Sequence, residues 1–255
     1  MSVVQALVLG IVQGITEFLP ISSSGHLILA PILFGWQEQP LAFDAVIHLG
    51  TLAAILAALR GDLPKLLERR GRLGWTILAA TIPALAIGFL FKDQIETVLR
   101  SPMVVAASLA LWGMLLWAGD RMVKPGASDD VTKVGYQRAM FIGVAQAIAL
   151  IPGTSRSGVT ITAGLFTGLS REAAARFSFL LGIPAIAAAG ASALLDVIDG
   201  AEPVAMLPLA VGFLAAFVFG ILAIRLLLKI LKTSTFVPFA VYRMLLAVVV
   251  FVLLR

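Results

Sequence analysis

Two polar breaks in an otherwise apolar chain decide the fold: Leu19-Pro-Ile-Ser-Ser-Ser-Gly25 and Ile151-Pro-Gly-Thr-Ser-Arg-Ser-Gly158. Each break separates two apolar stretches, 3–17 from 24–34 and 138–151 from 158–168. All four stretches are too short to cross a bilayer, whose hydrocarbon core needs about 20 helical residues. Two half-length helices around a polar turn are typical of a re-entrant pair, which returns to its own side of the membrane. One long kinked span is the alternative, but it would leave polar groups of the break unpaired in lipid.

The chain as a whole is strongly apolar. Of its 255 residues, 60% are hydrophobic and 13% are charged, and the mean hydropathy is +1.02. Soluble domains average about 25% charged residues, so a water-soluble enzyme and a disordered chain are both excluded. The formal net charge of +5 comes from cations in loops between apolar runs, which indicates membrane topology and no nucleic-acid partner. The absence of Cys excludes disulfides and thiolate metal sites.

Six longer apolar segments qualify as membrane-spanning helices. They cover residues 41–59, 73–91, 102–119, 174–195, 204–228 and 237–254. Together with the two re-entrant pairs, they predict an all-α integral membrane protein that forms a single membrane domain over residues 1–255.

The two breaks also repeat each other in sequence. Sliding the chain by 133 residues without a gap superposes identical residues: Gly10 on Gly143, Gln13 on Gln146, Ile15 on Ile148, Ser22 on Ser155, Ser24 on Ser157, Gly25 on Gly158 and Gly35 on Gly168. A period near half the length indicates a duplication, with repeats at 1–130 and 131–255. Each half holds one re-entrant pair and three spans, so the second half starts from the opposite side of the membrane. The sequence therefore predicts an inverted-topology repeat, which places a site near the membrane midplane.

Cations in the connecting loops predict the orientation. Three basic loops, 60–72, 120–138 and 225–235, fall on one side, which we expect to be cytoplasmic. The opposite side has the cations Lys92, Arg100 and Arg255, and a loop that carries Asp196, Asp199 and Glu202 and no cation. Both termini then lie outside, the first pair dips into the membrane from outside, and the second does so from the cytoplasm.

Three ionisable side chains lie in the segments around the breaks: Glu17, His26 and Arg156. An ionisable group costs about 3 kcal/mol at the centre of a bilayer, so each is by default a functional residue. If the two pairs meet tip to tip, all three converge on one place. The helices that follow the breaks would begin there, and two opposed helix N-termini attract an anion. The forked guanidinium of Arg156 suits the oxygens of a phosphate.

Small polar residues surround both helix starts: Ser22, Ser23, Ser24 and Gly25 at the first, and Ser155, Ser157 and Gly158 at the second. One Ser in each break is expected to cap its helix. A further Ser can act as a nucleophile when a base, His26 or Glu17, takes its proton. The glycines would allow close approach of the backbone to the anion.

Gln13 and Glu17 form the candidate metal site. They lie four residues apart, hence on one helix face, where their oxygens could jointly bind Mg²⁺ or Ca²⁺ beside a phosphate. This spacing is common in helices, so it indicates a metal site only because the two polar residues lie in an apolar segment.

Three other polar residues lie inside predicted spans. Asp44 and His48 are one turn apart and are expected to form a structural pair or a cap, with a supporting role in the site as the alternative. Arg243 is expected either to snorkel to the interface or to pair with an acid such as Asp44.

Two long motifs carry a resemblance to a known family: Gln13-Gly-Ile-Thr-Glu17-Phe-Leu-Pro20-Ile-Ser-Ser-Ser-Gly-His26 and Pro152-Gly-Thr-Ser-Arg-Ser-Gly-Val-Thr160. In these motifs, and in length and segment order, the chain resembles the undecaprenyl pyrophosphate phosphatase family of bacterial bacitracin-resistance proteins. The resemblance implies interlocked inverted repeats in the bacterial inner membrane, and a reaction that needs a divalent cation. That reaction is hydrolysis of undecaprenyl pyrophosphate to undecaprenyl phosphate, which recycles the lipid carrier of cell-wall synthesis. Together with the acidic outer side, this role favours a site that opens outward.

The resemblance also assigns roles to single residues. Ser23 matches the nucleophile with Ser22 beside it, His26 matches the motif histidine, and the phosphate-holding loop is matched by Ser155, Arg156 and Thr160. Glu17 matches the second acidic residue of the metal motif. Gln13 departs from the pattern, because many members have Glu there, and a neutral amide is a weaker ligand for a hard cation.

The implied mechanism starts with attack of Ser23 on the terminal phosphorus, with Glu17 or His26 as base, and ends when water hydrolyses a phosphoserine. Direct attack by water, with His26 as base, stays open. The alternative function is a transporter or flippase for a phosphorylated lipid or a small anion, because such carriers share this layout. The cluster of Ser, His and Glu favours hydrolysis. Besides the lipid substrate and membrane lipids, a second copy of the chain, in a homodimer, stays open as a partner.

Overall fold

The computed structural model describes residues 1–68, 72–91, 99, 101–198 and 205–253. These residues form eleven α-helices and one 3-10 turn, and no strand occurs in this part of the chain. Six charged residues named for the side opposite the basic loops lie outside the described residues or have no described side chain: Lys92, Arg100, Asp196, Asp199, Glu202 and Arg255.

All six predicted spans are helices in the structure: α3 (Leu41–Ala58), α5 (Leu73–Leu90), α7 (Pro102–Arg121), α10 (Arg171–Ile198), α11 (Met206–Ile230) and α12 (Val237–Leu253). The first five are long and apolar enough to cross a membrane, whereas α12 has 17 described residues and is shorter. The start of α10 lies before the predicted residue 174 because Ser170 caps it, accepting a hydrogen bond from the amide of Ala173 at 3.1 Å.

The four short apolar stretches are also helices, and each pair is interrupted where the sequence predicts a break. The bounds are α1 (Val3–Thr16) and α2 (Ser23–Phe34), then α8 (Tyr136–Ile148) and α9 (Arg156–Phe166). Two small elements inside the basic loops were not predicted: α4 (Leu63–Leu67) and the turn η1 (Val131–Lys133). Such short elements leave no hydrophobic period in the sequence.

The first helix of each half packs along a helix of the other half: α1 lies along α11, and α8 lies along α5. Both contacts are so close that they require glycine. A Cβ added to Gly10 would lie 2.5 Å from the carbonyl oxygen of Gly212, and one added to Gly143 would overlap the carbonyl of Ala80. Gly10 and Gly143 are a matched pair of the sequence repeat, so equivalent positions make equivalent contacts.

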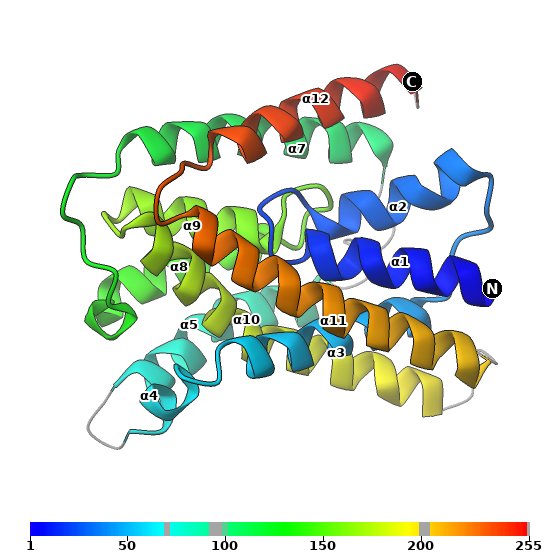
Figure 1. The fold of residues 1–255 in the computed structure, drawn as a ribbon, viewed down its shortest axis with the longest axis horizontal. Helices are drawn as coiled ribbons and strands as arrows, with labels where there is room; N and C mark the ends of the chain where they lie inside the picture. Colours follow the sequence, from blue (N-terminus) through cyan, green and yellow to red (C-terminus); the bar gives the residue numbers. More distant parts are fainter. Residues whose placement is uncertain (69–71, 92–98, 100, 199–204, 254–255) are drawn as a thin grey trace.

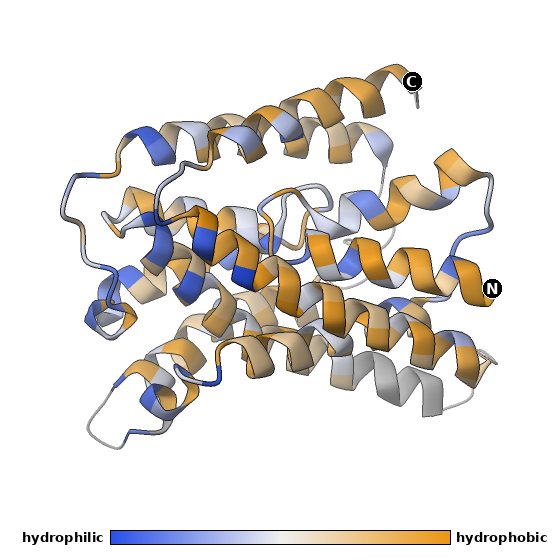
Figure 2. Ribbon diagram, viewed as in Figure 1, coloured by the Kyte–Doolittle hydropathy of each residue, from blue (hydrophilic) through white to orange (hydrophobic). Residues whose placement is uncertain are grey.

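Figure 1 shows α1 and α2 toward the right of the molecule and α8 and α9 toward the left, with their two connecting loops between them. Both termini lie at the right. The three basic loops, which include α4 and the end of α11, lie at the left, and Figure 2 shows hydrophilic residues concentrated there. Most helices are hydrophobic along their length (Figure 2). The chain is thus an all-α, multi-pass membrane protein with two interrupted helix pairs that face each other.

Candidate functional site

The helices that follow the two breaks begin in the same way. Ser22 caps α2 and Ser155 caps α9, because each hydroxyl oxygen accepts a hydrogen bond from the glycine amide three residues on, at 3.3 and 3.0 Å. Their φ angles are 76° and 70°, and they are the two non-glycine residues with positive φ in the described part of the chain. Backbone strain of this kind costs about 1–3 kcal/mol and clusters at functional sites. The strain that Ser22 and Ser155 share therefore makes both breaks candidates for the functional site.

The two breaks touch each other inside the molecule. The hydroxyl of Ser157 in the second break donates to the carbonyl oxygen of Leu19 in the first, at 3.2 Å. Beside them, the guanidinium of Arg243 donates to the carbonyl oxygens of Pro20 at 3.1 Å and of Thr154 at 2.9 Å. The two breaks are therefore in contact, as expected for pairs that meet at their tips.

Arg243 is completely buried, so the expectation that it snorkels is wrong. Its hydrogen bonds go to main-chain carbonyls, in the two breaks and in α7, where Ser108 and Leu109 lie. Carbonyls in irregular segments lack helical donors, and an unpaired buried carbonyl is costly. One guanidinium satisfies several of them at once. Arg243 thus clamps the two breaks together.

Glu17 is the hub of the candidate site. Its side chain is 6% exposed, and its Oε1 accepts a hydrogen bond from Nη2 of Arg156 at 2.7 Å. Its Oε2 accepts from Oγ of Ser23 at 2.7 Å and from Nε2 of Gln13 at 3.1 Å. The expected convergence of Glu17 and Arg156 is confirmed, and it brings the hydroxyl of Ser23 onto the same carboxylate.

Arg156, the first residue of α9, is held from three directions. Besides Glu17, it donates from Nη1 to the carbonyl oxygen of Ser178 in α10 at 3.0 Å. Gly182, one turn further along α10, lies so close that any side chain there would overlap the guanidinium. A guanidinium has five N–H groups, so these bonds leave donors for a further anion.

The hydrogen bonds of the His26 ring go to Ser22 and Tyr242 and not to Glu17. Its Nδ1 donates to the carbonyl oxygen of Ser22 at 2.7 Å, and its Nε2 lies 2.7 Å from the hydroxyl of Tyr242 in α12. Because the carbonyl can only accept, Nδ1 carries the hydrogen and Nε2 of the neutral ring accepts from Tyr242. The expected convergence of His26 with Glu17 and Arg156 thus does not occur in these contacts.

His48 of α3 is the histidine that faces Glu17. Its Nε2 lies 3.8 Å from Glu17 Oε2, and its Nδ1 lies 2.6 Å from the carbonyl oxygen of Asp44. The signal for this residue in the sequence is weak, namely a histidine one turn from an acid inside an apolar span. It could not indicate that α3 would pack beside the first break.

The hydroxyl groups of the two breaks differ sharply in exposure. The hydroxyls predicted to bind phosphate are buried and hydrogen-bonded to protein groups, and so is the amide of Gly25. These hydroxyls belong to Ser22, Ser155, Ser157 and Thr160. Thr160, for example, lies 2.6 Å from the hydroxyl of Ser178. Ser23 is half-buried and Ser24 is exposed. Ser23 thus combines access with a bond to a carboxylate.

The second break lacks this chemistry. Gln146, the counterpart of Gln13, is buried, and its side-chain amide has no hydrogen-bond partner among the described residues. The counterpart of Glu17 is Leu150. The first break therefore supplies the carboxylate and the accessible hydroxyl, and the second supplies the guanidinium.

The residues around Glu17 fit a divalent cation that takes only part of its ligands from the protein. The amide oxygen Oε1 of Gln13 is buried without a hydrogen-bond partner among the described residues, one turn from the carboxylate. Amide and carboxylate oxygens are ligands that Mg²⁺ and Ca²⁺ accept. The described residues contain no group of three His, Cys, Asp or Glu side chains that could hold a metal, so any cation here would also need the amide oxygen and phosphate or water oxygens.

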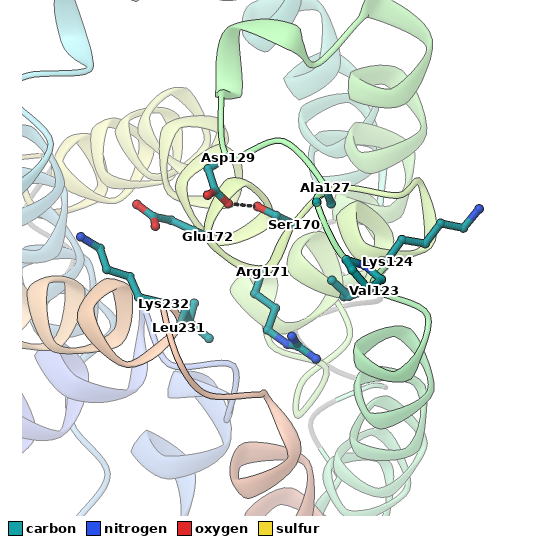
Figure 3. A pocket seen from close by; sticks show the side chains of 11 residues that line it. Val123, Lys124, Ala127, Asp129, Ser170, Arg171, Glu172, Leu231 and Lys232 are labelled. Atoms are coloured by element: carbon teal, nitrogen blue, oxygen red, sulfur yellow. Dashed lines mark hydrogen bonds between the residues drawn. The ribbon is translucent and has the colours of Figure 1, made fainter.

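A cavity of about 510 Å³ lies elsewhere, at the left end of the molecule in Figure 1. It is formed by the loop after α7, the start of α10 and the end of α11, and it contains none of the predicted site residues. Figure 3 shows Ser170 pointing toward Asp129, to which its hydroxyl donates. Arg171 in turn donates to Asp120 at 2.6 Å. These polar groups of the cavity wall are thus bonded to other protein groups, which indicates a structural role for them.

The fold and the site define a membrane protein with a polar centre suited to phosphate chemistry. The family described as bacitracin resistance protein BacA matches residues 6–249, so the chain belongs to this family. Two relatives named undecaprenyl-diphosphatase come from Teredinibacter turnerae and Idiomarina loihiensis. They are 45% and 44% identical to the chain, over alignments that cover 99% of it and 99% of each relative.

Proposed function

We propose that this protein is a membrane phosphatase that hydrolyses undecaprenyl pyrophosphate to undecaprenyl phosphate and inorganic phosphate. The names of its relatives support the substrate. The observation that carries the chemistry is the hydrogen bond of 2.7 Å from the Ser23 hydroxyl to a Glu17 carboxylate that also binds Arg156. Nucleophile, base and anion-binding group are then next to one another.

The first step is attack of Ser23 Oγ on the terminal phosphorus. Glu17 Oε2 takes the proton, a bond forms between Oγ and phosphorus, and the bond from phosphorus to the bridging oxygen breaks. Undecaprenyl phosphate leaves with the bridging oxygen. Arg156 stabilises the charge that spreads over the phosphoryl oxygens. Water then hydrolyses the phosphoserine and releases inorganic phosphate.

Glu17 is a better candidate for the base than His26. A general base must lie within hydrogen-bonding distance of the proton that it takes. Glu17 meets this condition for Ser23, while both ring nitrogens of His26 are engaged by Ser22 and Tyr242. These contacts also disfavour direct attack by a water that His26 activates. We therefore assign His26 the task of holding the strained Ser22 next to the nucleophile.

A divalent cation, Mg²⁺ or Ca²⁺, is part of the proposal. Gln13 and Glu17 would hold it, and when bound it would neutralise charge on the pyrophosphate. Glu17 alone carries a negative charge in this pair, and Arg156 already offsets that charge. The cation would consequently bind most tightly when the substrate is present.

The membrane arrangement follows the same proposal. Repeats 1–130 and 131–255 would be inverted, with both re-entrant pairs meeting at the midplane of the bacterial inner membrane. Two observations support this. Ser22 and Ser155 cap their helices in the same way, and α1 and α8 each pack along a helix of the other half. The basic loops at one end favour a cytoplasmic location for that end, termini outside, and a site that opens outward.

Phosphate release tests the function directly. Purified protein is mixed with undecaprenyl pyrophosphate in detergent, and inorganic phosphate is measured with and without a chelator of divalent cations. We expect release that stops with the chelator and resumes when Mg²⁺ or Ca²⁺ is added. Movement of the lipid across vesicle membranes without phosphate release would instead support a flippase and overturn the proposal.

A further inference from the structure

The histidine that faces Glu17 is held in one tautomer. The Nδ1 of His48 lies 2.6 Å from the carbonyl oxygen of Asp44, which can only accept, so Nδ1 carries the hydrogen. In the neutral ring, the lone pair is then on Nε2. That atom lies 3.8 Å from Glu17 Oε2, so two acceptor atoms face each other across a gap.

The gap between these two atoms is wide enough for one metal ion that both of them bind. Bonds from Mg²⁺ to oxygen and from similar ions to imidazole nitrogen are about 2.1 Å long, so one ion can contact two atoms that lie 3.8 Å apart. The His48 side chain is 32% exposed, so protein does not fully enclose the ring. Two atoms whose lone pairs face each other, without a hydrogen between them, are typical of a pair of metal ligands.

Gln13 approaches the same carboxylate oxygen. Its Nε2 donates to Glu17 Oε2 at 3.1 Å, and its Oε1 is the buried amide oxygen without a partner among the described residues. Oxygen and nitrogen of an amide exchange places when the group rotates by half a turn. Rotation of Gln13 would therefore turn an acceptor toward the gap between His48 and Glu17.

We propose that Nε2 of His48 is a third side-chain ligand, with Glu17 and Gln13, of the divalent cation that the proposed phosphatase function requires. A neutral nitrogen donor at this place offsets the absence of a second carboxylate, because position 13 is Gln. Mn²⁺ accepts an imidazole nitrogen beside oxygen ligands more readily than Ca²⁺, which takes oxygen ligands. His48 would therefore strengthen the binding of Mn²⁺ more than that of Ca²⁺.

The chain makes a spectroscopic test possible because it has only two histidines. The full-length protein, purified with a tag that lacks histidine, is loaded with Mn²⁺ alone and with Mn²⁺ plus inorganic pyrophosphate. Electron spin-echo measurements then report whether an imidazole nitrogen is bound to the metal. We expect the nitrogen signal in the wild type, a changed signal after labelling histidine with ¹⁵N, and loss of the signal in His48→Gln.

The matched control is His26→Gln, which removes the other histidine and should keep the signal. Binding titrations give a second measurement: we expect His48→Gln to weaken Mn²⁺ binding about tenfold and to change Ca²⁺ binding by less than about twofold. In the double variant Gln13→Glu with His48→Gln, a carboxylate replaces the lost nitrogen. We expect Mn²⁺ affinity to recover there without a nitrogen signal.

A nitrogen signal that survives in His48→Gln, or equal losses of Mn²⁺ and Ca²⁺ affinity, would overturn the assignment. The same holds if the wild type binds Mn²⁺ without a nitrogen signal. None of these measurements needs turnover, so they can fail while phosphate release from the lipid still supports the phosphatase. If His48→Gln does not fold, the comparison of unlabelled and ¹⁵N-labelled wild type with His26→Gln still decides the matter.

Discussion

Oε1 of Glu17 lies 2.7 Å from Nη2 of Arg156, and this ion pair joins the end of α1 in the first half of the chain to the start of α9 in the second. The two residues are 139 positions apart in sequence. Arg156 is therefore attached to the proposed base, and it reaches Glu17 because the two breaks touch. Under the proposed function, catalysis would depend on this contact between the halves.

We expect Arg156→Lys to lower kcat/KM at least about 100-fold. Loss of one donor to a developing oxyanion typically costs a factor of 100–1,000, and an ammonium cannot bind Glu17, Ser178 and a phosphate in the forked geometry of a guanidinium. Phosphate release is the measurement. Arg176→Lys is the matched control, because Arg176 binds Glu172 and Asp62 away from the site. Activity of Arg156→Lys within about threefold of wild type would make Arg156 a structural residue.

Ser23→Ala should abolish turnover and leave folding intact, since the half-buried hydroxyl donates to Glu17 and not to the main chain of the breaks. The neighbouring exposed residue gives the control: Ser24→Ala should keep most of the activity. Phosphate release and thermal unfolding are measured on both variants. A phosphoserine trapped at position 23 would support the covalent step directly, and near-normal turnover of Ser23→Ala would remove it.

Much of this fold could be predicted from the sequence because its signals are local. Each apolar stretch and each break became a helix or an interruption within a few residues of the predicted bounds. Counting membrane crossings predicted that the two halves are inverted, and the contact between the breaks was expected as a consequence of that arrangement. The family motifs placed Glu17, Ser23 and Arg156 correctly as neighbours, since all three lie at or beside the two breaks.

The residues that could not be predicted come from other helices. His48 in α3 and Tyr242 and Arg243 in α12 reach the site through tertiary packing, which leaves no spacing pattern in the sequence. His26 was expected at the site because it lies close to Ser23 in the sequence. Its ring instead bonds to Tyr242 of α12. Proximity in sequence does not determine where a side chain points.

Arg243→Met should destabilise the protein and lower its activity together. The substitution leaves several buried carbonyls of the two breaks without donors, and loss of one partner from a buried polar cluster costs on the order of 3 kcal/mol. Thermal unfolding in detergent micelles measures the first effect and phosphate release the second. Arg225→Met, at an exposed position of α11, is the control. An unchanged unfolding temperature in Arg243→Met would show that the clamp is not needed.

Tyr242→Phe tests whether α12 acts on the first break, which carries Ser22 and Ser23. The hydroxyl of Tyr242 is 2.7 Å from Nε2 of His26, whose other nitrogen holds the carbonyl of Ser22. If Tyr242 acts through His26, the substitution should lower kcat severalfold with little change in KM. It should have no further effect once His26 has been replaced by Gln.

The double-mutant cycle of Tyr242→Phe and His26→Gln makes this quantitative. Residues in direct contact couple by about 1 kcal/mol in such cycles, whereas distant pairs add to within about 0.5 kcal/mol. The chain has two tyrosines, so Tyr136→Phe, exposed at the start of α8, supplies the uncoupled comparison with His26→Gln. Additive losses for Tyr242 and His26 would mean that α12 acts on the first break through Arg243 and not through this hydrogen bond.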